Sequence, residues 1–248
     1  IIMGQQAGKC ATTGSCNIFL GTQSGLGASS SGVTGANNIG VGCKTLTCLT
    51  TGARNIAFGE SAGKSIEGGD DNFFVGRYAG DNTTSGTKNI FLGKYAGRGN
   101  TTTSNSIMMG QSAGENISGG SNIFMGYLAG QSSGTAADND ASQNISIGYE
   151  SGKLLTDGDR NIFLGRDAGS SVTTGCNNIY LGYFAGKYNA GTHCNIAIGL
   201  EAAHKMGDGS NNISIGTNSG SQSGTAADND AANNISIGQN AGCSLTDG

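Results

Sequence analysis

The sequence predicts an all-β protein, a parallel β-solenoid or β-roll of about fourteen coils with 17 residues in each coil. The phrase Asn-Ile-x-aliphatic-Gly, followed by two variable residues, a small residue and usually a second Gly, occurs fourteen times along the 248 residues. Most copies are 17 residues apart, and a short fixed period is typical of stacked repeats that bury a continuous core. The chain also has 46 Gly and no Pro, and its apolar runs are too short to predict a helix.

The Asn of the repeat predicts a ladder. We number each repeat from this Asn as position 0, and the equivalent positions of all repeats form a column. Longer spacings interrupt the period at three places and predict protruding loops near 26–36, 131–143 and 221–233. We expect the side-chain amides of column 0 to stack from coil to coil. With Ser106 replacing Asn in one copy and the first copy lacking it, the ladder residues are Asn17, Asn38, Asn55, Asn72, Asn89, Asn122, Asn144, Asn161, Asn178, Asn195, Asn212 and Asn234.

Columns +1 and +3 are predicted to form the core of the coil. Column +1 is Ile in every copy except Phe73, and column +3 is always Val, Ile, Leu, Met or Phe. Side chains of a strand alternate between its two faces, so these two columns share one face. We therefore expect them to point inward and column +2 to point outward.

Column +2 predicts contacts between chains. Eight of its fourteen residues are large and apolar, which is more than soluble monomers normally expose along one side. We expect this column to pack against the same column of other copies in a parallel homotrimeric fibre. The alternative is that loops of the same chain cover it. The expected interface residues are Phe19, Phe74, Phe91, Met108, Phe124, Phe163 and Tyr180.

Glycines mark the corners of the coil. Column +4 is Gly in all fourteen copies, which predicts a positive φ or a close backbone approach after each strand. Column +8 is Gly except at Leu46 and Ala203, column +7 is Ala, Ser or Thr, and another Gly near +14 marks the return turn. These small residues would let the repeat close into a narrow coil.

Composition and charge argue against several functions. The chain is predicted to be one continuous array over residues 1–248 and a segment of a longer fibre. Its net charge of −4 and scattered Lys and Arg argue against nucleic-acid binding, and no apolar run is long enough for membrane insertion. The seven Cys form no CxxC pair, which argues against zinc. Disulfides within a coil, disulfides between chains and unpaired thiols all remain open.

No catalytic, cofactor-binding or metal-binding residue is assigned. Residues 59–65 resemble a phosphate-binding P-loop, but the spacing is one residue short and both glycines belong to repeat columns. His193 and His204 stand in no nucleophile–base pattern. The duplicated segments 138–140 and 228–230 offer oxygen ligands to calcium, but they lack the EF-hand spacing, so solvated loops are the preferred interpretation.

The repeat resembles known fibre proteins. The phrase Asn-Ile-Phe-Leu-Gly-x-x-Ala-Gly, followed by Thr-Thr-Ser-Gly-Thr-Lys-Asn or Val-Thr-Thr-Gly-Cys-Asn-Asn, is similar to the glycine-rich repeats of phage and bacterial fibres. The phrase Ile-Ala-Ile-Gly resembles the head repeats of trimeric autotransporter adhesins, the YadA-like β-roll, although the period of 17 residues is longer than theirs. The resemblance implies an elongated trimeric shaft or head with an attachment function, located on a virion or outside the cell.

The expected function is therefore a structural and adhesive fibre segment rather than an enzyme. Other copies of the chain and a cell-surface glycan or receptor are the expected partners, and no cofactor is expected. One alternative is a monomeric ice-binding or other surface-binding solenoid, and another is a subunit of a self-assembling extracellular filament. Ice binding needs a regular Thr array on a flat face, whereas the Thr residues of this chain lie in the return turn and are interrupted by residues such as Glu67 and Asp157.

Overall fold

In the computed structural model the protein is an all-β parallel β-solenoid, as predicted, and its described residues form fourteen short strands, one for each copy of the repeat. The structure describes residues 1–28, 32–135, 139–206, 209–221 and 232–243. None of these residues lies in a helix, so no described helix could cross a membrane. The contacts divide the chain into two units, Ile1–Asn122 with Thr135–Ala137, and Ile123–Gly134 with Asp138–Gly248.

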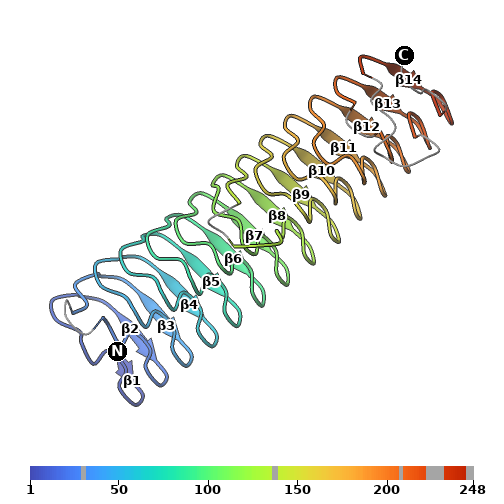
Figure 1. The fold of residues 1–248 in the computed structure, drawn as a ribbon. Helices are drawn as coiled ribbons and strands as arrows, with labels where there is room; N and C mark the ends of the chain where they lie inside the picture. Colours follow the sequence, from blue (N-terminus) through green and yellow to red (C-terminus); the bar gives the residue numbers. More distant parts are fainter. Residues whose placement is uncertain (29–31, 136–138, 207–208, 222–231, 244–248) are drawn as a thin grey trace. The chain divides into compact units, whose positions relative to one another are not determined.

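The first unit stacks seven strands in sequence order, each parallel to the next (Figure 1). The register keeps equivalent columns together, so that Ile39 faces Ile56 and Val41 faces Phe58. Residues 29–31 of the first predicted loop lie outside the described residues. The strands are β1 (Ile2–Met3), β2 (Ile18–Leu20), β3 (Ile39–Val41), β4 (Ile56–Phe58), β5 (Phe73–Val75), β6 (Ile90–Leu92) and β7 (Ile107–Met109).

The second unit repeats the same arrangement with seven further parallel strands. Ile162 faces Ile179, and Leu164 faces Leu181. Residues 136–138 and 222–231 of the other two predicted loops are not among the described ones. The strands are β8 (Ile123–Met125), β9 (Ile145–Ile147), β10 (Ile162–Leu164), β11 (Ile179–Leu181), β12 (Ile196–Ile198), β13 (Ile213–Ile215) and β14 (Ile235–Ile237).

The predicted orientation of the strand faces is wrong. From β2 to β14 the middle residue of every strand, in column +2, is buried, whereas the residues of columns +1 and +3 are half-buried or exposed. The side chains expected at a trimer interface therefore fill the interior of their own coil, each with 0% exposure. They are Phe19, Phe74, Phe91, Met108, Phe124, Phe163 and Tyr180.

The physical reason is a second interior column that the sequence pattern did not reveal. Eleven residues after the Asn, the return segment of the coil buries another side chain opposite column +2. This side chain is aliphatic in some coils, as at Ile66, and polar in others, as at Asn100. Rings of column +2 also stack on one another between coils, with 5.2 Å between the ring centroids of Phe74 and Phe91. The interior is thus closed by the chain itself. The buried residues of column +11 are Leu49, Ile66, Thr83, Asn100, Ile117, Leu155, Val172, Asn189 and Met206.

The corner after each strand needs unusual backbone conformations in columns +4 and +6. At Gly93, in column +4, φ is 135° and an added Cβ would lie 2.5 Å from the carbonyl oxygen of Gly110 in the next coil. Two residues later, column +6 takes a left-handed conformation without glycine, as at Tyr78 with φ 58° and Tyr95 with φ 63°. Such residues are uncommon and cost conformational energy. Their recurrence in the same column shows that the stacked coil imposes them.

Columns +2 and +8 are complementary in size. An alanine methyl at Gly97, where φ is 58°, would clash with the ring of Phe91. The two coils that lack Gly in column +8 both have a small residue in column +2. Leu46 accompanies Gly40, and Ala203 accompanies Ala197. Both Leu46 and Ala203 are fully buried in the left-handed conformation. In these two coils the larger side chain of column +8 fills the space that the small residue of column +2 leaves.

This complementarity predicts the outcome of two opposite substitutions. Gly97→Ala should lower the free energy of unfolding by about 2 kcal/mol or more, because it combines overpacking with a strained φ. Ala203→Gly should change it by no more than about 1 kcal/mol, since relief of strain offsets the added flexibility of the unfolded chain. Urea unfolding followed by circular dichroism measures both variants. Equal effects of the two substitutions would contradict the size rule.

Candidate functional site

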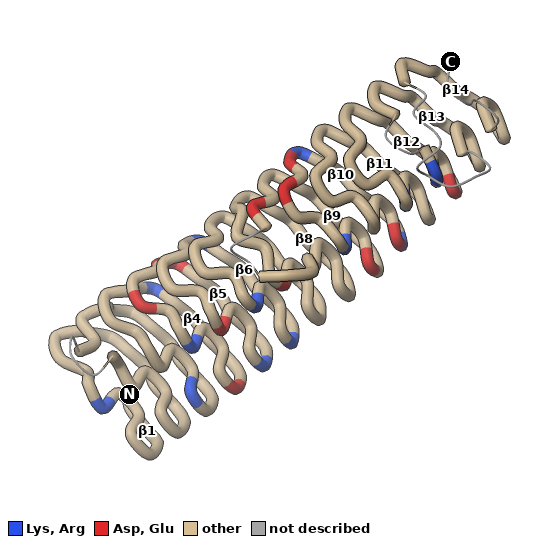
Figure 2. Tube along the Cα trace, in the orientation of Figure 1, with Lys and Arg blue, Asp and Glu red and all other residues tan. Residues whose placement is uncertain are grey.

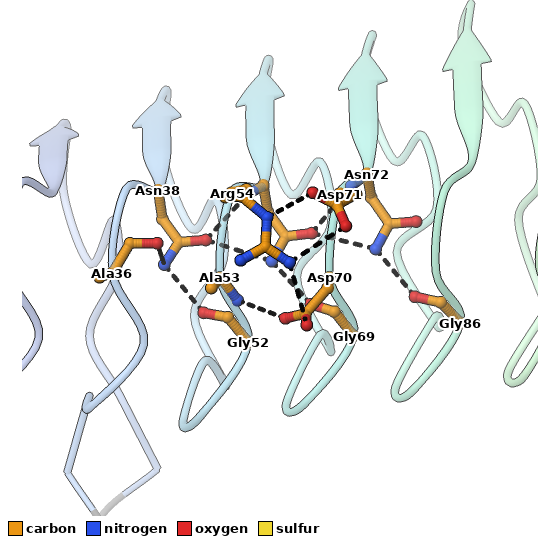
Figure 3. A network of polar contacts seen from close by, with 11 residues as sticks. Ala36, Asn38, Gly52, Ala53, Arg54, Gly69, Asp70, Asp71, Asn72 and Gly86 are labelled. Carbon is orange, nitrogen blue, oxygen red and sulfur yellow. Dashed lines mark hydrogen bonds and ion pairs between the residues drawn. The ribbon is translucent and has the colours of Figure 1, made fainter.

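A column of buried amides connects the coils of the first unit (Figure 3). The side-chain nitrogen of Asn72 donates to the side-chain oxygen of Asn55 at 3.0 Å and to the carbonyl oxygen of Gly86 at 2.8 Å. The side-chain oxygen of Asn72 accepts the backbone N–H of Asn89 at 3.1 Å and its side-chain N–H at 3.0 Å. Each amide thus joins three successive coils from a position that is closed to solvent.

The same ladder recurs along column 0 of both units. In the second unit, the backbone N–H of Asn161 donates to the side-chain oxygen of Asn144 at 2.9 Å. Ser106 continues the column in the first unit, because its hydroxyl oxygen accepts the backbone N–H of Asn122 at 3.1 Å. Further steps of the ladder involve Asn17, Asn38, Asn178, Asn195, Asn212 and Asn234.

The outer face of each sheet is apolar. Columns +1 and +3 contain no polar residue in any of the fourteen strands or at Ile1. Figure 2 shows the charged residues on the turns, while the strands are free of them. Stacking covers the flanks of these side chains and leaves their tips accessible, so that Phe58 is 39% exposed and Ile90 38% in the first unit. In the second unit Ile147 is 39% exposed and Leu164 36%.

Beside this face, column +5 of the second unit forms a ladder of aromatic rings and one guanidinium. The rings of Tyr127 and Tyr149 stack with 5.1 Å between centroids, and the guanidinium of Arg166 lies 5.2 Å from the ring of Tyr149 and 5.7 Å from that of Tyr183. The ring of Tyr149 is therefore contacted by both Tyr127 and Arg166.

Charged residues of neighbouring coils pair along the corners of the first unit. Arg54 binds Asp71 of the next coil and lies 3.3 Å from Asp70, and Arg77 lies 3.0 Å from Glu60 (Figure 3 for Arg54). These side chains are half-exposed, so each pair stabilises the fold only slightly. The pairs connect coils without forming a charged cleft.

A second charged column, +9, alternates in sign through Lys64, Asp81, Arg98 and Glu115. Asp81 is 8% exposed, and one of its carboxylate oxygens has no hydrogen-bond partner. Burial raises the pKa of the Asp81 carboxyl, although the Arg98 guanidinium at 4.0 Å opposes this shift. The ionised form of Asp81 is therefore disfavoured by the fold.

The second unit has a shallow pocket of about 200 Å³ between columns +6 and +9. Lys153 on one side pairs with Glu150 at 3.1 Å, and Lys187 on the other side lies 3.7 Å from Asp167. Both lysines are thus compensated within the chain. The residues that line the pocket are Glu150, Lys153, Leu154, Asp167, Ser170, Ser171 and Lys187.

The other chemically reactive residues come together in no common site within the described part of the chain. His193 accepts the backbone N–H of Cys176 at its Nδ1 atom, at 3.1 Å. Burial lowers the pKa of His204, which packs against the rings of Phe184 and Tyr188. All seven cysteines lie in described positions, and each is a free thiol.

The calcium hypothesis stays untested. Asp138 and residues 228–230 lie outside the described residues. Among the described residues no three His, Cys, Asp or Glu side chains are grouped to hold a metal ion. The features that do recur through both units are the buried amide ladder and the apolar outer face.

The ladder predicts a large effect of a single amide. Asn72→Ala removes four buried side-chain hydrogen bonds and should lower the free energy of unfolding by about 3 kcal/mol or more. Asn82→Ala, which truncates an exposed Asn two residues past the glycine of the same corner, should change it by less than about 0.5 kcal/mol. Thermal and urea unfolding would compare the two. Similar stability of both variants would show that the ladder is dispensable.

The two carboxylates Asp81 and Asp71 predict opposite pH effects. The raised pKa of Asp81 means that its contribution to stability falls as the pH rises above about 4, the unfolded value, and through the folded pKa. Asp81→Asn should therefore raise the thermal midpoint at pH 7 and lose this advantage at pH 3. The hydrogen bond from Arg54 lowers the pKa of Asp71, so the contribution of Asp71 is present above about 4 and is lost as the pH falls through the folded pKa.

The control is Asp71→Asn, which should leave the midpoint at pH 7 unchanged or lower it slightly, because this pair is exposed. Thermal unfolding at pH 3, 5 and 7 measures both variants. A lower midpoint for Asp81→Asn at pH 7 would contradict the assignment.

Comparisons of this chain with protein-family models, with curated proteins and with solved structures find no match.

Proposed function

We propose that the chain is a structural and adhesive segment of a fibre outside the cell or on a virion, and that it is not an enzyme. The observation that carries this proposal is the buried amide ladder, in which each step binds one coil to its neighbours through several hydrogen bonds. A scaffold that must hold its form needs such coil-to-coil cohesion, and turns that protrude from it are free to vary. Cell-surface glycans or receptors are the proposed partners of these turns.

We also propose that three copies assemble into a homotrimer. The interior aromatic rings no longer support this stoichiometry, because they are buried within one chain. Its support is the shape of the outer apolar face, which is only one short strand wide in each coil. Three such narrow faces can meet around a common axis and leave the charged turns in water. The resemblance of the repeat to trimeric fibres favours the same number.

The alternative of an ice-binding solenoid is less well supported by the geometry. The hydroxyls of Thr50, Thr84 and Thr173 donate to the carbonyl oxygen of the next coil, at 3.0 to 3.3 Å. Glu67 interrupts the column between Thr50 and Thr84. These hydroxyls are therefore used within the fold, and the array is not regular. A self-assembling filament remains close to the main proposal, because it uses the same scaffold.

Light scattering coupled to size-exclusion chromatography, together with binding to a glycan array, tests the proposal. We expect a particle of three chains that is stable to dilution and binds cell-surface glycans or whole cells through its turns. Solution X-ray scattering should show an extended particle. A compact monomer that binds no glycan and no cell would contradict both the fibre role and the trimer.

A further inference from the structure

The distribution of polar residues between the two faces of the strands is inverted. The buried column +2 contains Gly40 and the serines Ser146, Ser214 and Ser236, and the hydroxyl of Ser146 has no hydrogen-bond partner. The accessible columns +1 and +3 contain neither a polar residue nor a glycine in any of the fourteen coils. Water accepts polar residues at no cost, so an uncovered face has no physical reason to exclude them. The face is therefore more strictly apolar than the core.

The extent of this face agrees with an interaction surface. Strands are about 4.8 Å apart and each short strand spans about 10 Å, so the seven strands of a unit present roughly 340 Å². The two units of one chain add up to about 700 Å², and a pair of chains would bury about 1,400 Å². That value lies within the range of specific protein–protein interfaces, about 1,200 to 2,000 Å².

We infer that the face formed by columns +1 and +3 is a self-association surface, covered by the same face of the other copies of the chain around the axis of the proposed trimer; this inference rests on the proposed fibre role. Another copy has the same spacing between strands, so its rows of side chains match the rows of each unit. Apolar side chains of facing strands interdigitate and exclude water. The face carries no charge that a copy would have to neutralise.

Column +5 of the second unit forms a polar and aromatic rim beside the apolar face. Column +5 of the second unit places exposed tyrosines beside the face, with Tyr149 at 45% and Tyr183 at 42% exposure. Exposed tyrosines, together with Arg166, are typical of the rim of an interface, where one side is dry and the other is wet. A lipid surface is a different partner for an apolar face with such a rim, and the experiment must separate the two.

The test compares two pairs of substitutions in the full chain. Ile90→Lys with Leu164→Lys places one charge on the face of each unit. Thr102→Lys with Thr174→Lys adds the same charges to exposed turn residues of the same two units and is the matched control. Light scattering and sedimentation at several concentrations give the mass and the dissociation constant. We expect the wild type and the control to be oligomers, and the face variant to associate at least tenfold more weakly.

A second variant guards against unfolding. Ile90→Thr with Leu164→Thr keeps β-propensity on the face and replaces part of each apolar side chain by an uncharged hydroxyl. It should retain the circular dichroism spectrum of the wild type and still associate more weakly than the control. An unchanged mass in both face variants would overturn the inference and leave the fibre proposal in place, because the copies would then meet elsewhere.

The remaining outcomes also decide the question. A monomeric wild type at tens of micromolar would overturn the inference together with the proposed trimer. A monomeric wild type that floats with phosphatidylcholine vesicles, and whose face variant does not, would replace the other copies by a lipid surface. Flotation of both variants would place any lipid contact outside this face.

Discussion

The hydrogen bonds between buried amides in column 0 are the constraint on which the rest of the structure depends. Each amide binds the preceding Asn, the following Asn and a carbonyl oxygen of the return turn, as Asn72 does with Asn55, Asn89 and Gly86. These contacts form only if neighbouring backbones lie at the strand spacing and in register. Extra residues must therefore leave the coil as loops, which is why the longer spacings leave the phase of the repeat unchanged. The tight corner at Gly93, where a Cβ would meet the next backbone, follows from the same spacing.

The sequence was sufficient to predict the parallel solenoid, the Asn column and the glycine corners, but it did not predict which face of the strand is buried. Alternate residues of a strand lie on opposite faces, and the polar face is normally the exposed one. Both faces of these strands are largely apolar, so the alternation does not show which face is buried. The deciding residues lie outside the strand, at the left-handed column +6 and at the buried column +11. One signal was available: Leu46 occurs in the coil with Gly40, and Ala203 in the coil with Ala197. Such compensation in volume is expected only between side chains that share an interior.

The same compensation explains why the interior varies more than the outer face. A small residue in column +2 leaves space that column +8 or +11 of the same chain can fill, so a change is corrected locally. A side chain of columns +1 and +3 has no other segment of its own coil above it. If another molecule covers the face, every coil must present a similar apolar surface, because one gap or one polar group would remain uncorrected. The constancy of Ile in column +1, with only Phe73 as an exception, is consistent with that requirement.

The repeated columns do not distinguish one coil from another, and the alternating charges supply a difference between neighbouring coils. The Asn, Ile and Gly columns would pair equally well if the stack slipped by a whole coil. In column +9, Lys64, Asp81, Arg98 and Glu115 alternate in sign, and a slip of one coil during folding would place like charges in neighbouring coils at about 4.8 Å. The contacts of Arg98 in this column, with Asp81 at 4.0 Å and with Glu115 at 3.6 Å, are long and the Arg98 side chain is half-exposed, so they contribute only modestly to stability. The alternation has a larger effect on register. Like charges at that distance destabilise the slipped stack, whereas the correct stack places no like charges side by side in this column. Asp81 is buried and the pKa of its carboxyl is raised, so the charge that favours the correct register destabilises the fold at this position.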